Sequence, residues 1–207
     1  MSNATKQSKR QRREQARIER QRQLRRAARR KRLRGFGIAV VSVAVMGLVG
    51  FALVRSSNTG VAFAGDIRQG GKLESLHLPQ LQGKGTVDYA SFRSKPLVIN
   101  FFASWCPNCI AEMPGFQQVH QQLGDRVGFL GISQSDSRGA SIHLAEQTGI
   151  HYPTGYDAHG TFYNATGSTG MPTTLFVRPG GQIAYIQVGA LDTNTLRQYI
   201  ARYLGGS

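Results

Sequence analysis

Two cysteines, Cys106 and Cys109, are the residues of this chain best suited to chemistry. They are its only cysteines and stand three positions apart, in the segment WCPNC. Residues 97–102, just before this segment, form an apolar run rich in Val, Ile and Phe that predicts a buried strand. Pro107 suits the first turn of a helix. A C-x-x-C that a strand delivers to the start of a helix indicates a redox-active pair, which can close and open a disulfide.

The start of a helix predicts different roles for the two sulfurs. Unpaired N–H groups and the positive end of the helix dipole stabilise Cys106 as a thiolate, the form that attacks a disulfide. Cys109, one turn deeper, would then resolve the mixed disulfide that Cys106 forms with a partner. Pro107 and Asn108 between them add no positive charge. That argues against the strongly stabilised thiolate of the strongest oxidants.

Two other uses of the cysteine pair stay open on spacing alone. One is a static structural disulfide, although a bridge that closes so short a loop restrains the unfolded chain little. The other is half of a zinc site. Zinc takes four ligands, and the chain has neither a second C-x-x-C nor histidines at a zinc-binding spacing. We therefore expect redox chemistry with no metal and no cofactor.

The hydrophobic pattern around the cysteines predicts one α/β domain. Strands are expected at residues 97–102, 127–132, 173–177 and 182–188, with a short hairpin within residues 76–92. Helices are expected at residues 106–123 and 141–148, and from a cap at Asp192 to about Leu204. The order β-α-β-α-β-β-α gives a central mixed sheet with helices on both faces.

Charge is distributed very unevenly along the chain. Residues 1–34 hold 15 Lys and Arg against two acidic residues, whereas residues 55–207 are close to neutral. Residues 35–54 carry no charge, and twenty residues of helix span roughly 30 Å, the thickness of a hydrocarbon core. The basic arm has no aromatic residue to stack on a base, so nucleic acid is not an expected partner. Contact with anionic lipid headgroups is expected instead.

These segments predict a single-pass protein of the bacterial cell membrane. Residues 1–34 would be a cytoplasmic arm and 35–54 a transmembrane helix, because positive charge favours the cytoplasmic side. Residues 55–72 would be a tether, and 73–205 an extracytoplasmic domain. A cleaved signal peptide is the alternative, with a candidate site at residues 62–64 (AFA), although the leader is long for one. Either topology exports the cysteine pair to a place where disulfides persist.

Three motifs resemble one family. Residues 100–109 (NFFASWCPNC) look like the active-site segment of the thioredoxin superfamily. Residues 109–114 (CIAEMP) are similar to the TlpA/ResA/CcmG-like branch of membrane-anchored thiol-disulfide oxidoreductases. Residues 170–174 (GMPTT) resemble the cis-proline loop of this family. The resemblance runs from about residue 73 to 204 and implies a thioredoxin-like fold.

The resemblance also implies roles for further residues. Pro172 is expected to be cis and to lie beside the disulfide, where the backbone of Met171 can pair with an extended partner segment. Trp105 and Pro107 are expected on the docking surface, with an ordinary core tryptophan as the alternative for Trp105. Glu112 would take the proton from Cys109, or would be only a first-turn glutamate favoured by the dipole.

Asn100 marks a departure from thioredoxins proper, which carry a buried aspartate at this position. An asparagine cannot move a proton, so that function would pass to Glu112 or to water. Asparagine does occur here in the ResA-like branch, which supports the narrower resemblance.

The expected function is disulfide exchange with exported proteins outside the cytoplasm. The resemblance favours a reductant, with apocytochrome c as one candidate substrate and a membrane redox protein as donor or acceptor. The alternatives are an oxidant that introduces disulfides and a non-catalytic binding module with a static disulfide. A redoxin-type peroxidase is a further alternative, but both cysteines are used by the C-x-x-C. The oligomeric state is left open.

Overall fold

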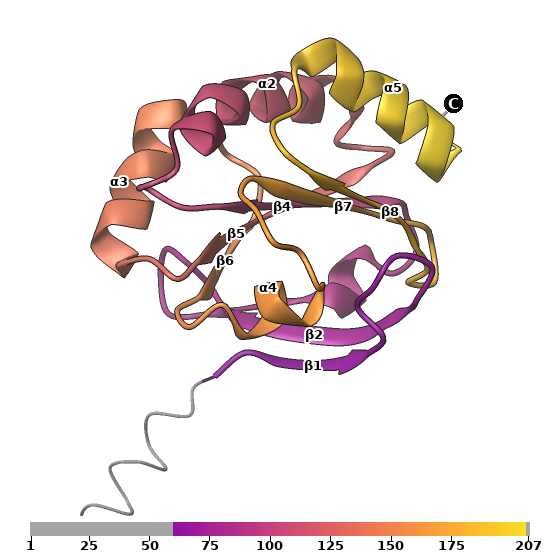
Figure 1. The fold of residues 1–207 in the computed structure, drawn as a ribbon, viewed down its shortest axis with the longest axis horizontal. Coiled ribbons are helices and arrows are strands. Elements are labelled where there is room, and N and C mark those ends of the chain that lie inside the picture. Colours follow the sequence, from indigo (N-terminus) through magenta and orange to yellow (C-terminus); the bar gives the residue numbers. More distant parts are fainter. Residues whose placement is uncertain (1–59, 206–207) are drawn as a thin grey trace, which may run out of the picture. The chain divides into compact units, whose positions relative to one another are not determined.

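The strand that leads to the cysteines is the centre of the sheet (Figure 1). The computed structural model describes residues 60–205. Within them, β4 (Leu97–Phe102) is buried along its whole length. β5 (Gly128–Gln134) pairs parallel with it on one side, and β7 (Thr173–Val177) antiparallel on the other. β6 (Thr154–Asp157) and β8 (Ile183–Val188) complete the order β6-β5-β4-β7-β8. The predicted central mixed sheet is confirmed.

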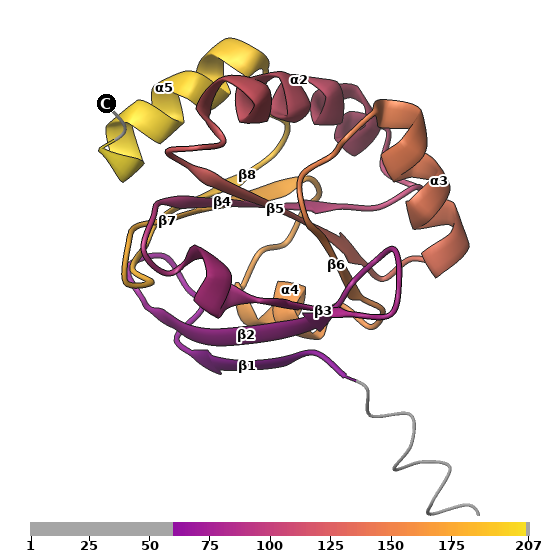
Figure 2. The ribbon, with the colours of Figure 1, turned by 180° about the vertical axis from the view of Figure 1, so that it is seen from behind.

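Three helices cover one face of this sheet. They are α2 (Pro107–Leu123), α3 (Arg138–Thr148) and α5 (Thr193–Leu204). Figures 1 and 2 show α2 and α5 lying along the same side of the sheet. Their apolar side chains share one core with Val98 and Phe102, the residues of β4 that point toward them. The alternation of side chains along a strand therefore sets which residues of β4 can reach α2.

A second layer covers the opposite face. It consists of a three-stranded antiparallel sheet, a 3₁₀ turn and a short helix: β1 (Ala62–Gly65), β2 (Leu73–Pro79), β3 (Thr86–Asp88), η1 (Tyr89–Phe92) and α4 (Thr161–Ala165). Leu97, Ile99 and Phe101 of β4 point into this second core. The layer is visible below the central sheet in Figure 2.

The folded part begins earlier than residue 73, so the predicted tether of residues 55–72 is wrong from residue 62 onward. Residues 62–65 form β1 and pair antiparallel with β2. Phe63 packs edge-on against Phe162 of α4, with ring centroids 5.2 Å apart. A Cβ at Gly65, whose φ is +115°, would collide with the carbonyl oxygen of Lys72. Because β1 is an edge strand that buries little, its sequence lacks the alternation that marks a half-buried strand.

The other differences from the predicted elements are small. β6 and α4 were not predicted, because a four-residue strand and a five-residue helix are too short to establish a period. α3 begins at Arg138 rather than at residue 141, after a cap at Ser137. α5 and its cap at Asp192 are as predicted.

The predicted basic arm and membrane helix, residues 1–34 and 35–54, lie outside the described residues, as does the start of the predicted tether. None of the helices within residues 60–205 has the length and apolar character needed to span a bilayer.

Replacing Phe63 tests whether β1 is an integral part of the domain. Phe63→Ala should lower the free energy of unfolding by about 1–2 kcal/mol, because it removes a half-buried aromatic contact. Arg68→Ala is the matched control in the same segment. It removes only an exposed ion pair with Asp66, so it should change the stability by less than about 0.5 kcal/mol. Equal denaturation midpoints for Phe63→Ala and the wild type would mean that the contact of Phe63 with Phe162 adds nothing to the stability of the fold.

Candidate redox site

Cys106 and Cys109 form a disulfide at the start of α2. Their Cα atoms are 5.3 Å apart, within the usual range for a disulfide. Cys106 is the N-cap of α2, with extended backbone, and Pro107 occupies the first turn as predicted. Both cysteines are buried: Cys106 is 4% exposed and Cys109 is fully buried. Access from outside is therefore through Cys106.

The start of α2 favours negative charge on the first sulfur. The backbone N–H of Cys109 donates a hydrogen bond to the Sγ atom of Cys106 at 3.1 Å. When the disulfide opens, this N–H and the helix dipole would stabilise a thiolate at Cys106. The geometry fits the predicted roles of attacking sulfur for Cys106 and resolving sulfur for Cys109.

Glu112 lies one turn further along α2, on the same helix face as Cys109, and its carboxyl group is in the core. Only 5% of the residue is exposed. One carboxyl oxygen accepts a hydrogen bond from Asn100 at 2.8 Å, and the other accepts from the backbone N–H of Leu191 at 2.9 Å. Burial raises the pKa of Glu112 to about 7, although these two hydrogen bonds favour its charged form. A group with this pKa can hold or release a proton near neutral pH.

Asn100 presents its amide to Glu112 from β4. Its Nδ2 atom also lies 3.3 Å from the hydroxyl oxygen of Thr174 on β7. The Oδ1 atom is buried and, within the described residues, has no hydrogen-bond partner. Since an amide can turn, Asn100 can offer either a donor or an acceptor to the carboxyl group of Glu112. Asn100 can therefore hydrogen-bond to Glu112 in both of its protonation states, although the amide cannot itself carry the proton.

The loop before β7 supplies the predicted proline. The Met171–Pro172 peptide bond is cis, as the resemblance implied. Phe101 of β4 stands opposite Thr173 in the sheet register, so Pro172 lies beside the end of β4 that leads to Cys106. The N–H of Gly189 donates to the carbonyl oxygen of Pro172 at 2.9 Å and fixes the loop from the end of β8. The fold thus brings the two motifs to the same edge of the sheet.

Two large apolar side chains are exposed within residues 60–205, and both lie by this edge. Trp105, next to Cys106, is 55% exposed. Val188 is 44% exposed and stands opposite Thr173, the residue after Pro172. An apolar surface at the cysteine pair suits the docking role predicted for Trp105. Nothing in the sequence pattern singled out Val188.

Sequence reasoning also missed two groups that hold the site. One is the backbone N–H of Leu191, which carries no sequence signal because any residue except proline could supply it. The other is Asp136, whose carboxylate accepts from the backbone N–H of Ser104 at 2.6 Å. Its place in the loop after a predicted strand was the one feature of the sequence that could have drawn attention to Asp136. No sequence pattern, however, indicated that this loop lies next to the cysteines.

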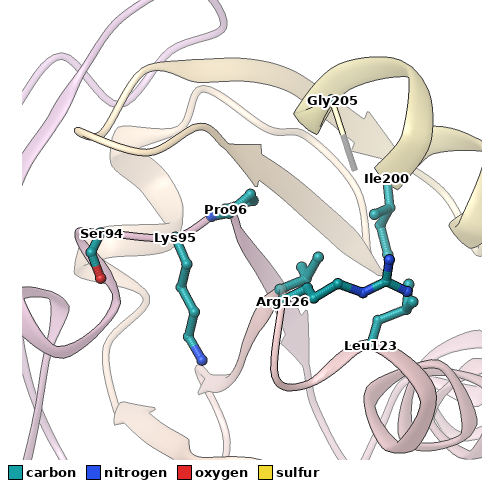
Figure 3. A pocket seen from close by; sticks show the side chains of 8 residues that line it. Ser94, Lys95, Pro96, Leu123, Arg126, Ile200 and Gly205 are labelled. Atoms are coloured by element: carbon teal, nitrogen blue, oxygen red, sulfur yellow. The ribbon is translucent and has the colours of Figure 1, made fainter. Parts of the chain in front are cut away.

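A cavity of about 370 Å³ lies elsewhere in the domain (Figure 3). Its lining residues come from the segment before β4, from the end of α2 and the loop after it, and from the C-terminal part of α5 with its cap: Ser94, Lys95, Pro96, Leu123, Arg126, Val127, Ile200 and Gly205. Because Pro96 precedes β4 and Cys106 follows it, the cavity and the disulfide lie at opposite ends of the central strand. Lys95 donates to the carbonyl oxygen of Gly124, 3.3 Å away, at the end of α2. We assign this cavity no part in the redox chemistry.

Comparisons with known proteins agree with the site. The AhpC/TSA family matches residues 70–186. The chain is 34% identical over 142 residues to the thiol:disulfide interchange protein DsbE of Yersinia pestis. This match covers 66% of this chain and 72% of that protein. It is 28% identical over 118 residues to the thiol-disulfide oxidoreductase ResA of Oceanobacillus iheyensis, covering 56% of this chain. The chain spans 62% of that ResA, less than two thirds of its length.

Solved structures give the same assignment. A secreted Mycobacterium tuberculosis disulfide oxidoreductase, described as homologous to DsbE of E. coli, shares 26% identity with a TM-score of 0.55. The match covers 61% of this chain and 94% of that one. A thioredoxin family thiol:disulfide interchange protein of Chlorobium tepidum shares 27% identity with a TM-score of 0.57, over 64% of this chain and 94% of that one. The chain therefore belongs to the AhpC/TSA family and is a thioredoxin-like relative of the thiol-disulfide oxidoreductases named ResA and DsbE.

Proposed function

We propose that this protein reduces disulfides of exported proteins outside the cytoplasm, with Cys106 as nucleophile and Cys109 as resolving thiol. The observation that carries the proposal is the disulfide at the start of α2 with the carboxyl group of Glu112 in the core one turn beyond Cys109. This arrangement offers a stabilised thiolate at Cys106, the less buried of the two sulfurs, and a proton acceptor one turn beyond Cys109. Thiol-disulfide exchange needs both.

The proposed reaction has two displacement steps. The Cys106 thiolate attacks one sulfur of a partner disulfide, a mixed disulfide forms, and the other partner sulfur leaves as a thiolate. Cys109 then gives its proton to the carboxylate of Glu112 and attacks the Sγ atom of Cys106. The second partner sulfur leaves, and the Cys106–Cys109 disulfide forms again. Two electrons have passed to the partner, which now holds two thiols.

Partner docking is assigned to the apolar edge around the pair. We place Trp105, Pro107, Met171 and Pro172 at this edge. Trp105 and Pro107 are exposed, Met171 is half-buried, and Pro172, which follows it in the loop, is buried. An extended segment of the partner could pair with the backbone of Met171, as in strand addition. Backbone pairing tolerates many sequences, which would suit an enzyme with several substrates.

The location outside the cytoplasm is supported by the charge pattern. Fifteen cations precede the apolar residues 35–54 and nothing comparable follows them. A relative from Mycobacterium bovis, 29% identical over 151 residues, is named a soluble secreted antigen. A reductant in that compartment needs electrons from inside, so we propose a membrane redox protein as its donor. The narrower TlpA/ResA/CcmG-like assignment and a role in cytochrome c maturation belong to the same proposal.

The reduction potential of the cysteine pair tests the direction of the reaction. The full chain is equilibrated with thiol-disulfide buffers, and the reduced fraction is measured by alkylation. A reductant should give a value near about −270 mV or lower, whereas a value near about −120 mV would mean that the protein introduces disulfides. A disulfide that no thiol opens in the native state would refute exchange altogether and leave a binding module.

A further inference from the structure

Asp136 ties the turn that carries the cysteine pair to a neighbouring loop. It lies between β5 and α3, and its carboxylate accepts from the backbone N–H and the hydroxyl of Ser104, at 2.6 and 3.0 Å. The same carboxylate accepts from the backbone N–H of Ser137 at 2.7 Å and from the hydroxyl of Ser141 at 2.9 Å. Ser104 stands two residues before Cys106. One side chain therefore joins the cysteine turn to the first turn of α3.

The same loop holds Trp105. The indole N–H donates to the carbonyl oxygen of Ser135 at 3.1 Å, although more than half of the residue is exposed. Ser135 has a φ of 47° and is the only non-glycine residue with positive φ within residues 60–205. A serine keeps this uncommon conformation only where its surroundings impose it. The hydroxyl of Tyr156 donates to the carbonyl oxygen of Asp136 at 2.8 Å and helps to impose it.

Hydrogen bonds, rather than a cation, balance the charge of Asp136. Neither of the two ion pairs within the described part of the chain includes it. Arg138, two residues on, directs its guanidinium to two backbone carbonyls between β2 and β3. Burial acts to raise the pKa of Asp136, but its four hydrogen bonds leave the pKa below the ordinary value. The carboxylate is therefore charged and able to accept at neutral pH.

We infer that Asp136 is a positioning residue for protein partners: it holds residues 103–106, and Trp105 with them, in the geometry that a partner's disulfide meets. The inference rests on the proposed function. A small thiol needs to reach only a sulfur atom, whereas a protein also contacts Trp105. An aromatic side chain that is already ordered loses little conformational entropy on binding. Loss of the hydrogen bonds that Asp136 accepts should therefore slow exchange with proteins more than exchange with small thiols.

Three variants of the full chain test the inference. The pre-reduced protein is mixed with insulin, the oxidised protein with dithiothreitol, and both reactions are stopped by acid. Asp136→Ala should lower the second-order rate constant with insulin about 3- to 10-fold, while that with dithiothreitol changes less than about twofold. Asp136→Asn keeps one acceptor oxygen and should be intermediate. Ser104→Ala removes only the hydroxyl bond and provides a mild variant should Asp136→Ala not fold.

Trp105 provides a readout that general destabilisation would not move, because it is the only tryptophan of the chain. Its fluorescence anisotropy should decay faster in Asp136→Ala than in the wild type, in the folded protein. Asp88→Ala is the matched control: it removes an aspartate that caps η1 through the N–H of Ala90 and pairs with His77, and it should leave both readouts unchanged.

Equal slowing with insulin and dithiothreitol, or unchanged anisotropy of Trp105, would overturn the role of Asp136. Failure of the proposed function has a different signature. In that case the wild-type chain itself would react with dithiothreitol but not with insulin, while the anisotropy would still report whether Asp136 orders Trp105.

Discussion

Cys109→Ala should leave the protein covalently attached to its partners in cells. Without Cys109 the chain has no second thiol to attack the Sγ atom of Cys106, so the mixed disulfide formed in the first step persists. Turnover of a disulfide substrate should fall on the order of 10³-fold or more, as expected when one member of a two-residue unit is lost. Non-reducing electrophoresis should show higher-mass adducts that dithiothreitol removes. Mass spectrometry of these adducts would identify the partners.

The assignment of Cys106 as the attacking sulfur rests on its position at the helix cap and on its exposure. Cys106 keeps a small exposed fraction, whereas Cys109 is fully buried beneath it. Cys106→Ala is therefore the matched control, and it should give no adducts because a partner disulfide cannot reach Cys109. Adducts in Cys106→Ala, and none in Cys109→Ala, would reverse the two roles.

The redox pair could be predicted from the sequence because its parts are contiguous. The apolar strand, the two cysteines and Pro107 follow one another, so local patterns were enough. The Met171–Pro172 bond lies more than 60 residues away, and only the family resemblance connected it with the cysteines. Periodicity and a capping aspartate located α5 in the same local way.

Asp136 could not be connected with the cysteines in this manner. It acts on Ser104 across 32 residues, and the parallel pairing of β4 with β5 brings the two together. β1 was missed for a different reason, since an edge strand that packs chiefly through Phe63 lacks the burial that creates a pattern. The sequence could not predict contacts that exist only because strands far apart in the chain pair in the folded protein.

Glu112→Gln should slow the second exchange step and remove its dependence on pH near 7. Above a pKa of about 7 the carboxylate can accept the proton of Cys109, and below it the group is already protonated. In the wild type, release of a trapped partner should therefore slow as the pH falls through 7. A glutamine cannot accept the proton, so release should slow by about 10²-fold at pH 8. Single-turnover release of a preformed mixed disulfide measures this step directly.

The same substitution should make the folded protein more stable, although it slows exchange. Burial places the folded-state pKa of Glu112 near 7, above the ordinary value of 4.5. Between pH 4.5 and pH 7 the unfolded chain releases this proton while the folded protein keeps it, so the free energy of unfolding falls as the pH rises. The full cost above pH 7 is about 3 kcal/mol. Glu112→Gln should therefore gain stability relative to the wild type between pH 5 and pH 8.

The hydrogen bonds around Glu112 allow this gain. The glutamine oxygen can accept from the N–H of Leu191, and its amide can donate to the free Oδ1 atom of Asn100 once that amide turns. Glu146→Gln, at an exposed position on α3, is the control and should change neither exchange nor the pH dependence of stability. A Glu112→Gln protein that gains stability and exchanges as fast as the wild type would make Glu112 a buried structural group only. Slower exchange together with higher stability would show that Glu112 takes part in proton transfer and that its burial lowers the free energy of unfolding.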